Sequence, residues 1–294
     1  MISSLQNQTR DADATARAID AHLFKMLQDV ACELGRPVDF PTSFNTALRL
    51  RQALEDPDLP TVRIAAVVGL EPLIATRVMN LAKSVIYGTC GTPVRDLHTA
   101  IDRLGVEVVR TAALGIAMSQ LVHAREMASF SDIAQVVWNH SVRSAAAARI
   151  LARTQTRINP DEALLAGLVH DLGAFYMLFR AVHYPELRSR PDAVKSIILQ
   201  LHESIGVTLL KALGMSDEVV DATIDHDQIR PGPIAVRTLA DIVYYSNFIA
   251  GSQGEWFSGD VDPNNGEPGV VRRHFKDLLA GVEADTGEML AVFA

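Results

Sequence analysis

Residues 164–173 read LLAGLVHDLG, an apolar segment that ends in the adjacent pair His170 and Asp171. Asn159 and Pro160 stand just ahead of it as a candidate N-cap and first helical residue. The segment therefore predicts an apolar helix that carries an imidazole and a carboxylate side by side at its C-terminal end.

Further candidate ligands follow this pair at the spacing of successive helices. His140 lies thirty residues before His170 (170 − 140), on an Ala-rich helix predicted over residues 133–152. The set is completed on later helical segments by His202, His226 and Asp241. An antiparallel helical bundle can bring one position from each helix to a single central point.

Helical periodicity extends through the rest of the chain, with apolar residues recurring at spacings of three and four. Helices are predicted over residues 18–34, 64–68, 73–81, 100–105, 106–122, 133–152, 163–171, 192–212, 216–226, 233–249 and 270–284. Half-buried strands show alternating polar and apolar residues, and no stretch of this sequence long enough for a strand has that pattern. Aromatic residues make up only 6%, which also favours helices over a β-sandwich or barrel. We predict an all-α fold, a two-lobed helical bundle.

The predicted lobes divide the chain into four parts. Residues 1–17 form an N-terminal tail, residues 18–128 the first helical lobe and residues 129–250 the second. Residues 251–294 contain a loop followed by a terminal helix, because five glycines and two prolines fall within residues 251–269.

Composition excludes several classes of protein. The 294 residues carry 27 basic and 35 acidic side chains, and the net charge of −8 disfavours a nucleic-acid partner. Two cysteines cannot form a disulfide framework, and uninterrupted apolar runs such as residues 64–68 are too short for a membrane helix. Residues 1–17 lack the apolar core of a signal peptide, so we expect a cytoplasmic protein without a membrane association.

The candidate ligands suit a metal centre. Imidazole nitrogens and carboxylate oxygens bind divalent Fe, Mn, Zn or Mg. Two such metals, about 3.5–4 Å apart, could hold a phosphate and activate a water. Other interpretations stay open: His140, His170 and Asp171 can be buried and hydrogen-bonded without a metal, His202 and His226 can interact with helix ends, and Asp241 can be a residue in the N-terminal turn of a helix. Residues 225–227 can also be a solvated helix end.

The arrangement of a histidine, a His-Asp pair and a distant aspartate resembles the HD superfamily of metal-dependent phosphohydrolases. The resemblance places the signature on His140, His170, Asp171 and Asp241. Extra histidine ligands in the HD-GYP branch, which degrades cyclic di-GMP, correspond to His202 and His226.

Residues 41–250 resemble one branch of that superfamily, the HDOD (HD-related output domain) proteins. The likeness is carried by EPLIATRVMNLAKSVIYG at 71–88, LHTAIDRLGVEVVRTAAL at 97–114, VWNHSVRSAAAARILA at 137–152, DEALLAGLVHDLG at 161–173 and LHESIGVTLLKALGMSDEVVDATIDHD at 201–227. The last segment ends in His226-Asp227 where the family often has His-His. The resemblance implies that the second lobe is the HD-like bundle.

Departures from the catalytic branch decide the predicted function. Ala174 follows Gly173 where HD-GYP proteins have Lys, Val136 replaces a Glu, and residues 225–236 lack the Gly-Tyr-Pro element. The family is regarded as regulatory, so the resemblance implies a bacterial signal-transduction output module with no assigned catalytic residues. It would act through a signalling protein partner or a second copy of itself, with a nucleotide as a candidate ligand. The alternative is a metal-dependent phosphohydrolase or cyclic-dinucleotide phosphodiesterase.

Overall fold

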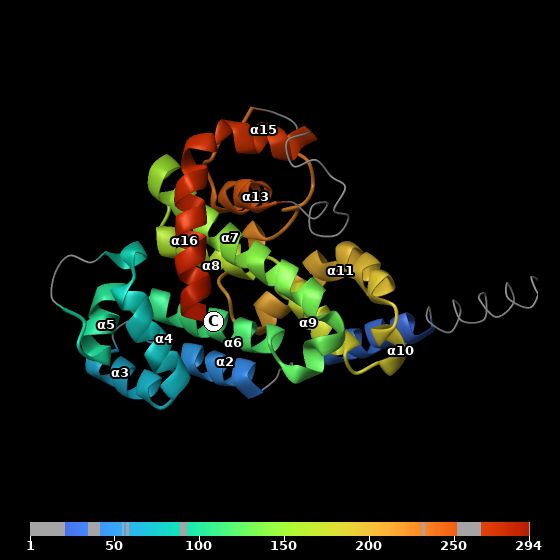
Figure 1. Cartoon of the computed structure of the whole chain (residues 1–294), viewed down its shortest axis with the longest axis horizontal. Helices are drawn as coiled ribbons and strands as arrows, with labels where there is room; N and C mark the ends of the chain where they lie inside the picture. Colours follow the sequence, from blue (N-terminus) through green and yellow to red (C-terminus); the bar gives the residue numbers. More distant parts are fainter. Residues whose placement is uncertain are drawn as a thin grey trace, which may run out of the picture.

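The computed structural model describes residues 21–34, 42–54, 56, 59–88, 93–230, 233–251 and 266–293. Every regular element within these residues is a helix, which confirms the all-α prediction (Figure 1). The predicted tail at 1–17 and most of the predicted loop at 251–269 lie outside the described residues.

The first part of the described chain surrounds one central helix. Its elements are α2 (Thr42–Ala53), α3 (Thr61–Gly69), α4 (Pro72–Lys83), η1 (Val85–Tyr87), α5 (Leu97–Leu104) and α6 (Val106–Val122). Helix α6 is apolar on nearly all sides and buried along most of its length, because α2, α4 and α5 pack around it. Asp96 caps α5 by accepting the Thr99 N–H at 2.8 Å, and Gly105, at φ 79°, turns the chain into α6.

The second part is the bundle that supplies the candidate ligands. After η2 (Arg125–Phe130) it contains α7 (Ser131–Gln155), α8 (Pro160–Val169), α9 (Leu172–Ala181), α10 (Pro185–Arg188), α11 (Pro191–Ala212), α12 (Asp217–Ala222) and α13 (Leu239–Ala250). Helix α7 packs against α8 and α13, and α9 packs against α11. The Asn159 side chain accepts the Asp161 N–H at 2.9 Å with Pro160 as the first residue of α8, as predicted.

The end of the chain joins the two parts. Helix α15 (Gly266–His274) and η3 (Lys276–Leu278) lead into α16 (Leu279–Phe293), whose last residues lie at the centre of the molecule (Figure 1). Ser119 of α6 donates to the Phe293 carbonyl at 2.8 Å, and the Phe293 ring lies 5.5 Å from that of Trp138 on α7. Buried side chains from both predicted lobes form one continuous hydrophobic cluster.

Most predicted helices differ from the structure by up to three residues at an end, and three differ more. The helix predicted at 216–226 ends at Ala222, because Asp225 adopts a left-handed conformation with φ 56°. The helix predicted at 233–249 begins at Leu239, where Thr238 and Asp241 form a capping box. The terminal helix predicted at 270–284 is divided into α15 and α16 by η3.

Among the described residues, two helical stretches are long and apolar enough to cross a membrane by length and composition alone, and the pair α5 and α6, bent by 106°, would be a third. The two stretches are Pro160–Ala181, which joins α8 and α9, and Pro191–Ala212. The most apolar window of the first is 89% buried inside the fold, and that of the second is 39% buried. Burial in the core accounts for the hydropathy of the first, and the second presents one apolar face to α9.

Helix α9 can approach α11 only because residue 173 has no side chain, and this generates a first prediction. A Cβ atom on Gly173 would lie 1.9 Å from the His202 backbone oxygen. We expect Gly173→Ala to lower the free energy of unfolding by about 1–3 kcal/mol or more, since the backbone of α11 must shift. Urea and thermal denaturation measure the loss.

Gly287→Ala is the matched control for this substitution. Gly287 also lies within a helix, but a Cβ there meets nothing within 4 Å. Replacing it is expected to raise stability by about 0.5–1 kcal/mol. Equal effects at the two positions would contradict the close packing of α9 on α11.

Candidate metal centre

The junction between α8 and α9 presents the His-Asp pair to the interior. His170 directly follows α8, and its Nδ1 lies 2.8 Å from the Gly167 carbonyl oxygen one turn earlier. Asp171 is the residue that precedes α9. Both side chains are fully buried, so their polar atoms must be satisfied within the protein.

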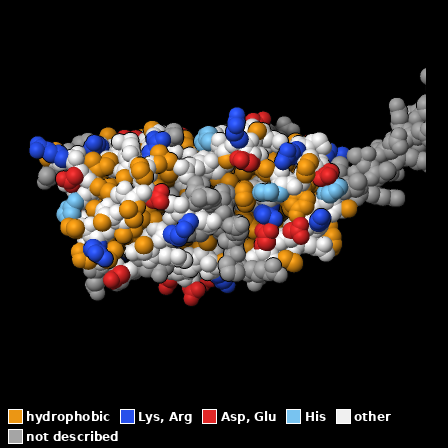
Figure 2. Space-filling model, turned by 90° about the horizontal axis from the view of Figure 1, so that it is seen from below, with side chains coloured by type: hydrophobic (Ala, Val, Ile, Leu, Met, Phe, Trp, Pro, Cys, Tyr) orange, Lys and Arg blue, Asp and Glu red, His pale blue; other side chains and the backbone are white. Residues whose placement is uncertain are grey.

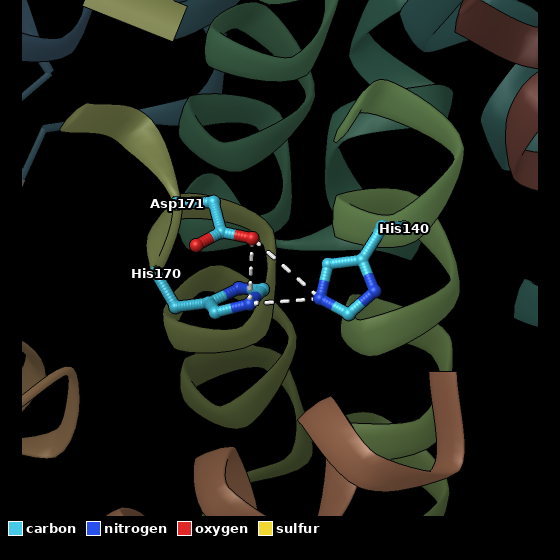
Figure 3. Close-up of side chains that lie close together, drawn as sticks. All are labelled: His140, His170 and Asp171. Carbon is cyan, nitrogen blue, oxygen red and sulfur yellow. Dashed lines mark hydrogen bonds and ion pairs between the residues drawn. The ribbon is translucent and has the colours of Figure 1, made fainter. Parts of the chain in front are cut away.

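One oxygen of Asp171 faces the imidazoles of His140 and His170 (Figure 3). Asp171 Oδ2 lies 3.1 Å from His170 Nε2 and 3.5 Å from His140 Nε2. The two Nε2 atoms are 3.2 Å apart. Ligand atoms of these three residues lie within 4.8 Å of one another, close enough to share one metal ion.

The other oxygen of Asp171 faces a second pair of imidazoles. Asp171 Oδ1 lies 3.4 Å from Nε2 of His202, on α11, and 3.4 Å from Nε2 of His226, which follows α12. These two Nε2 atoms are 3.3 Å apart. Asp171, His202 and His226 form a second group that could hold a metal ion, so the carboxylate of Asp171 is common to both groups.

Backbone carbonyls orient three of the four imidazoles. Nδ1 of His170 lies 2.8 Å from the Gly167 oxygen, as described, Nδ1 of His202 3.0 Å from the Ile198 oxygen, and Nδ1 of His226 2.7 Å from the Thr223 oxygen. A carbonyl oxygen can only accept, so each Nδ1 carries the proton. In a neutral ring Nε2 then holds a lone pair directed at the centre, the usual arrangement for a metal-binding histidine.

The side chains present fit a divalent cation. Asp171 is buried, and neither carboxylate oxygen has a hydrogen-bond partner of good geometry. Lone pairs of neutral imidazoles facing this carboxylate, and one another at 3.2 and 3.3 Å, repel unless a cation or a proton lies between them. Nitrogen and oxygen ligands of this kind suit Zn, Fe or Mn.

The charges within the cluster shift the pKa values of its members in opposite directions. Burial lowers the pKa of His140 to about 4, although Asp171 acts against this. Burial also disfavours the cation at His226, but Asp227 and then Asp171 raise its pKa to about 9. Burial disfavours ionisation of Asp171, yet the adjacent histidines, His170 first, hold its pKa well below the usual value. Asp227 and Asp171 therefore favour a proton on His226, and the histidines favour the charged form of Asp171.

Asp241 is the predicted ligand that the structure places elsewhere. Its Oδ2 accepts the N–H groups of Arg237 and Thr238 at 3.0 and 2.9 Å, and its Oδ1 lies 3.8 Å from Arg230. The carboxylate caps the start of α13 and belongs to neither metal group among the described residues.

Two side chains that sequence reasoning did not assign lie at the centre instead. Asp227 Oδ2 is 3.3 Å from Nε2 of both His202 and His226. Asn247, buried on α13, donates to Asp227 Oδ1 at 2.8 Å. The direct adjacency of Asp227 to His226, like that of Asp171 to His170, was the available signal. Because His226 is buried, residues 225–227 are not a fully solvated helix end.

Comparison with known proteins identifies a family. The profile of the HDOD domain matches residues 40–229 of the 294. A curated but uncharacterised protein of Treponema pallidum (strain Nichols) is 23% identical over 223 residues, which is 71% of this chain. The match spans 42% of that protein's length, so the chain covers less than half of this relative.

Solved structures share the fold. A protein of Shewanella amazonensis SB2B, named as a candidate metal-dependent phosphohydrolase, has a TM-score of 0.71 at 23% identity, covering 96% of this chain and 100% of its own. An HDOD domain protein of Geobacter sulfurreducens has a TM-score of 0.57 at 17% identity, covering 92% and 99%. A protein of Marinobacter aquaeolei VT8, named as a candidate signal transduction protein, has a TM-score of 0.53 at 20% identity. The match covers 90% of this chain and 65% of that protein's chain.

The geometry of the cluster generates a second prediction. We expect His170→Ala to lower metal content and melting temperature together, because the substitution removes one ligand and leaves Asp171 with fewer partners. Elemental analysis and calorimetry, before and after treatment with a chelator, measure both. Chelation is expected to lower the melting temperature of the wild type and to reduce the difference in melting temperature between the wild type and His170→Ala.

His183→Ala is the control, because His183 is exposed and its Nδ1 bonds only the Phe179 carbonyl within its own helical region. This variant should keep the metal content of the wild type. Unchanged metal content in His170→Ala would show that the cluster does not hold the metal.

Proposed function

The chain belongs to the HDOD family, and on that premise we propose that it is a regulatory module of bacterial signal transduction. Its buried His/Asp cluster holds divalent metal ions, and their binding sets the shape of the surface offered to a protein partner. This proposal rests on the family, on the chemistry of the cluster and on its lack of exposure to solvent.

The metal ligands follow from the two groups described above. His140, His170 and Asp171 Oδ2 would hold one cation, and the other would be held by His202, His226 and Asp171 Oδ1. When bound, such cations supply Lewis acidity and lower the pKa of a coordinated water. The protein's own groups orient the imidazoles through backbone carbonyls and exclude solvent from the centre.

The observation that carries the regulatory proposal is the closure of the cluster. The side chains of His140, His170, Asp171, His202 and His226 are each at most 3% exposed. A phosphodiester cannot reach Asp171 without a rearrangement of the surrounding helices. Ala174, where the catalytic branch has Lys, is fully buried and supplies no cation. A closed centre of this kind favours structural control over turnover.

Exposed apolar side chains support an action through protein contacts. Val62 on α3, Leu70 in the following turn and Leu73 on α4 are 65%, 77% and 41% exposed. Figure 2 shows hydrophobic side chains gathered over the end of the molecule that contains α3 to α5. The net charge of −8 favours a protein partner or a second copy over nucleic acid. We place the protein in the cytoplasm and keep a nucleotide as a candidate ligand.

Metal-dependent phosphohydrolysis is the second candidate function, and one observation favours it. A carboxylate shared between two groups of imidazoles resembles what a two-metal hydrolase requires. The structural neighbour from Shewanella amazonensis SB2B is named for that activity. The two candidates differ in whether substrate reaches the centre.

A hydrolysis assay separates the two functions and gives the third prediction. We expect the manganese-loaded protein to hydrolyse cyclic mononucleotides and dinucleotides no faster than Asp171→Asn, in which the shared carboxylate is lost. Product formation is followed by chromatography at saturating substrate. Turnover by the wild type that Asp171→Asn abolishes would establish the hydrolase and overturn the regulatory proposal.

A further inference from the structure

The two halves of the centre differ by one carboxylate. The first half consists of His140, His170 and one oxygen of Asp171. The second half contains the other oxygen of Asp171 with His202 and His226, and Asp227 Oδ2 lies 3.3 Å from both of these imidazoles. An added negative charge strengthens the attraction for a divalent cation.

Asp227 is also the point at which the centre approaches solvent. Its side chain is 16% exposed, whereas the five other side chains of the cluster are at most 3% exposed. A cation arriving from solvent therefore meets Asp227 and the second half before it meets the first half.

An amide on α13 bonds the Asp227 carboxylate. Asn247 Nδ2 donates to Asp227 Oδ1 at 2.8 Å and to the His226 carbonyl oxygen at 3.0 Å. Both neighbours accept, so the NH2 group must face them. With Oδ1 bound to Asn247, Asp227 turns its Oδ2 toward the imidazoles.

The amide is not explained by packing. Asn247 is completely buried, and its Oδ1 has no hydrogen-bond partner among the described residues. An apolar residue of similar size would avoid this unsatisfied Oδ1, but it would leave the His226 carbonyl oxygen and Asp227 Oδ1 without their donor. The two hydrogen bonds that the NH2 group donates are therefore the reason for an asparagine at residue 247.

The turn that carries His226 and Asp227 needs such an anchor. Asp225 adopts φ 56°, a conformation in which residues other than glycine are uncommon, and its Oδ1 accepts Gln228 Nε2 at 2.6 Å. His226 Nδ1 lies 2.7 Å from the Thr223 carbonyl oxygen. These contacts are local to the turn. Arg230 joins the end of the turn to Tyr244 of α13, and Asn247 is the residue of α13 that bonds Asp227 itself.

We propose that Asn247 is a positioning residue for the second half of the centre: by holding Asp227 against His202 and His226, it makes this half bind a divalent cation first and more tightly. The inference rests on the proposed metal centre. It assigns different affinities to the two halves and a separate role to a residue that contacts no metal.

Manganese binding by equilibrium dialysis tests the proposal in the full chain. The wild type is expected to bind two Mn²⁺ in separable steps, the tighter one in the second half. Asn247→Leu removes both donated hydrogen bonds at similar volume and should weaken the tighter step 10–100-fold, the usual effect of losing a residue that orients a ligand. The weaker step should be unchanged.

Ser246→Ala is the matched control. Ser246 is the neighbouring buried residue on α13 and bonds Ser144 and Val243, away from the turn. It should lose thermal stability without a change in either binding step. If Asn247→Leu weakens both steps equally, or neither, the positioning role is overturned. Asn247→Ser, which cannot span both acceptors, replaces the leucine variant if that variant does not fold.

Structures of the metal-free variants give a second readout that does not depend on metal. The Asp227 carboxylate should turn away from His202 and His226 in Asn247→Leu and remain in place in Ser246→Ala. If the wild type binds no Mn²⁺, the proposed metal centre fails. The movement of Asp227 then decides the role of Asn247: an unmoved carboxylate overturns it, and a displaced one retains it as the anchor of the turn.

Discussion

A buried carboxylate that faces four imidazoles is the constraint on which this structure depends. Asp171 is inaccessible to solvent, and each of its oxygens lies 3.1–3.5 Å from two Nε2 atoms. A buried charge is tolerated only when opposite charge compensates it. Because the histidines come from α7, the end of α8, α11 and the turn after α12, this compensation sets the relative positions of all these elements.

Small residues make the close approach of these helices sterically feasible. Gly173 of α9 lies against the backbone of α11, and a Cβ on Gly167 of α8 would meet the Ser144 carbonyl oxygen of α7 at 2.9 Å. The alanines at 145–148 allow α7 to be buried on several sides. Close backbone contact brings short ligands such as Asp171 to imidazoles on other helices, and it also closes the centre to solvent.

Much of the fold could be predicted from sequence because helical periodicity is a local property. Residues 106–122 were predicted as a helix with the bounds that α6 has, and Asn159 and Pro160 marked the start of α8. The spacing of Asp241 favoured a metal ligand, but the structure has the alternative, a place in the first turn of α13, where Asp241 forms a capping box with Thr238. The place of Asp227 in the centre depends on the left-handed conformation of Asp225, and the role of Asn247 depends on a hydrogen bond to a residue twenty positions away. Helical periodicity in the sequence predicts neither feature.

The central claim is that Asp171 joins two cation sites in one centre, and electron paramagnetic resonance of the manganese-loaded protein tests it most directly. Two Mn²⁺ ions joined by one carboxylate interact magnetically. We expect two Mn²⁺ per chain and the signal of an exchange-coupled pair, which Asp171→Asn converts to isolated ions or to none. Absence of bound Mn²⁺, or only isolated ions in the wild type, would contradict it.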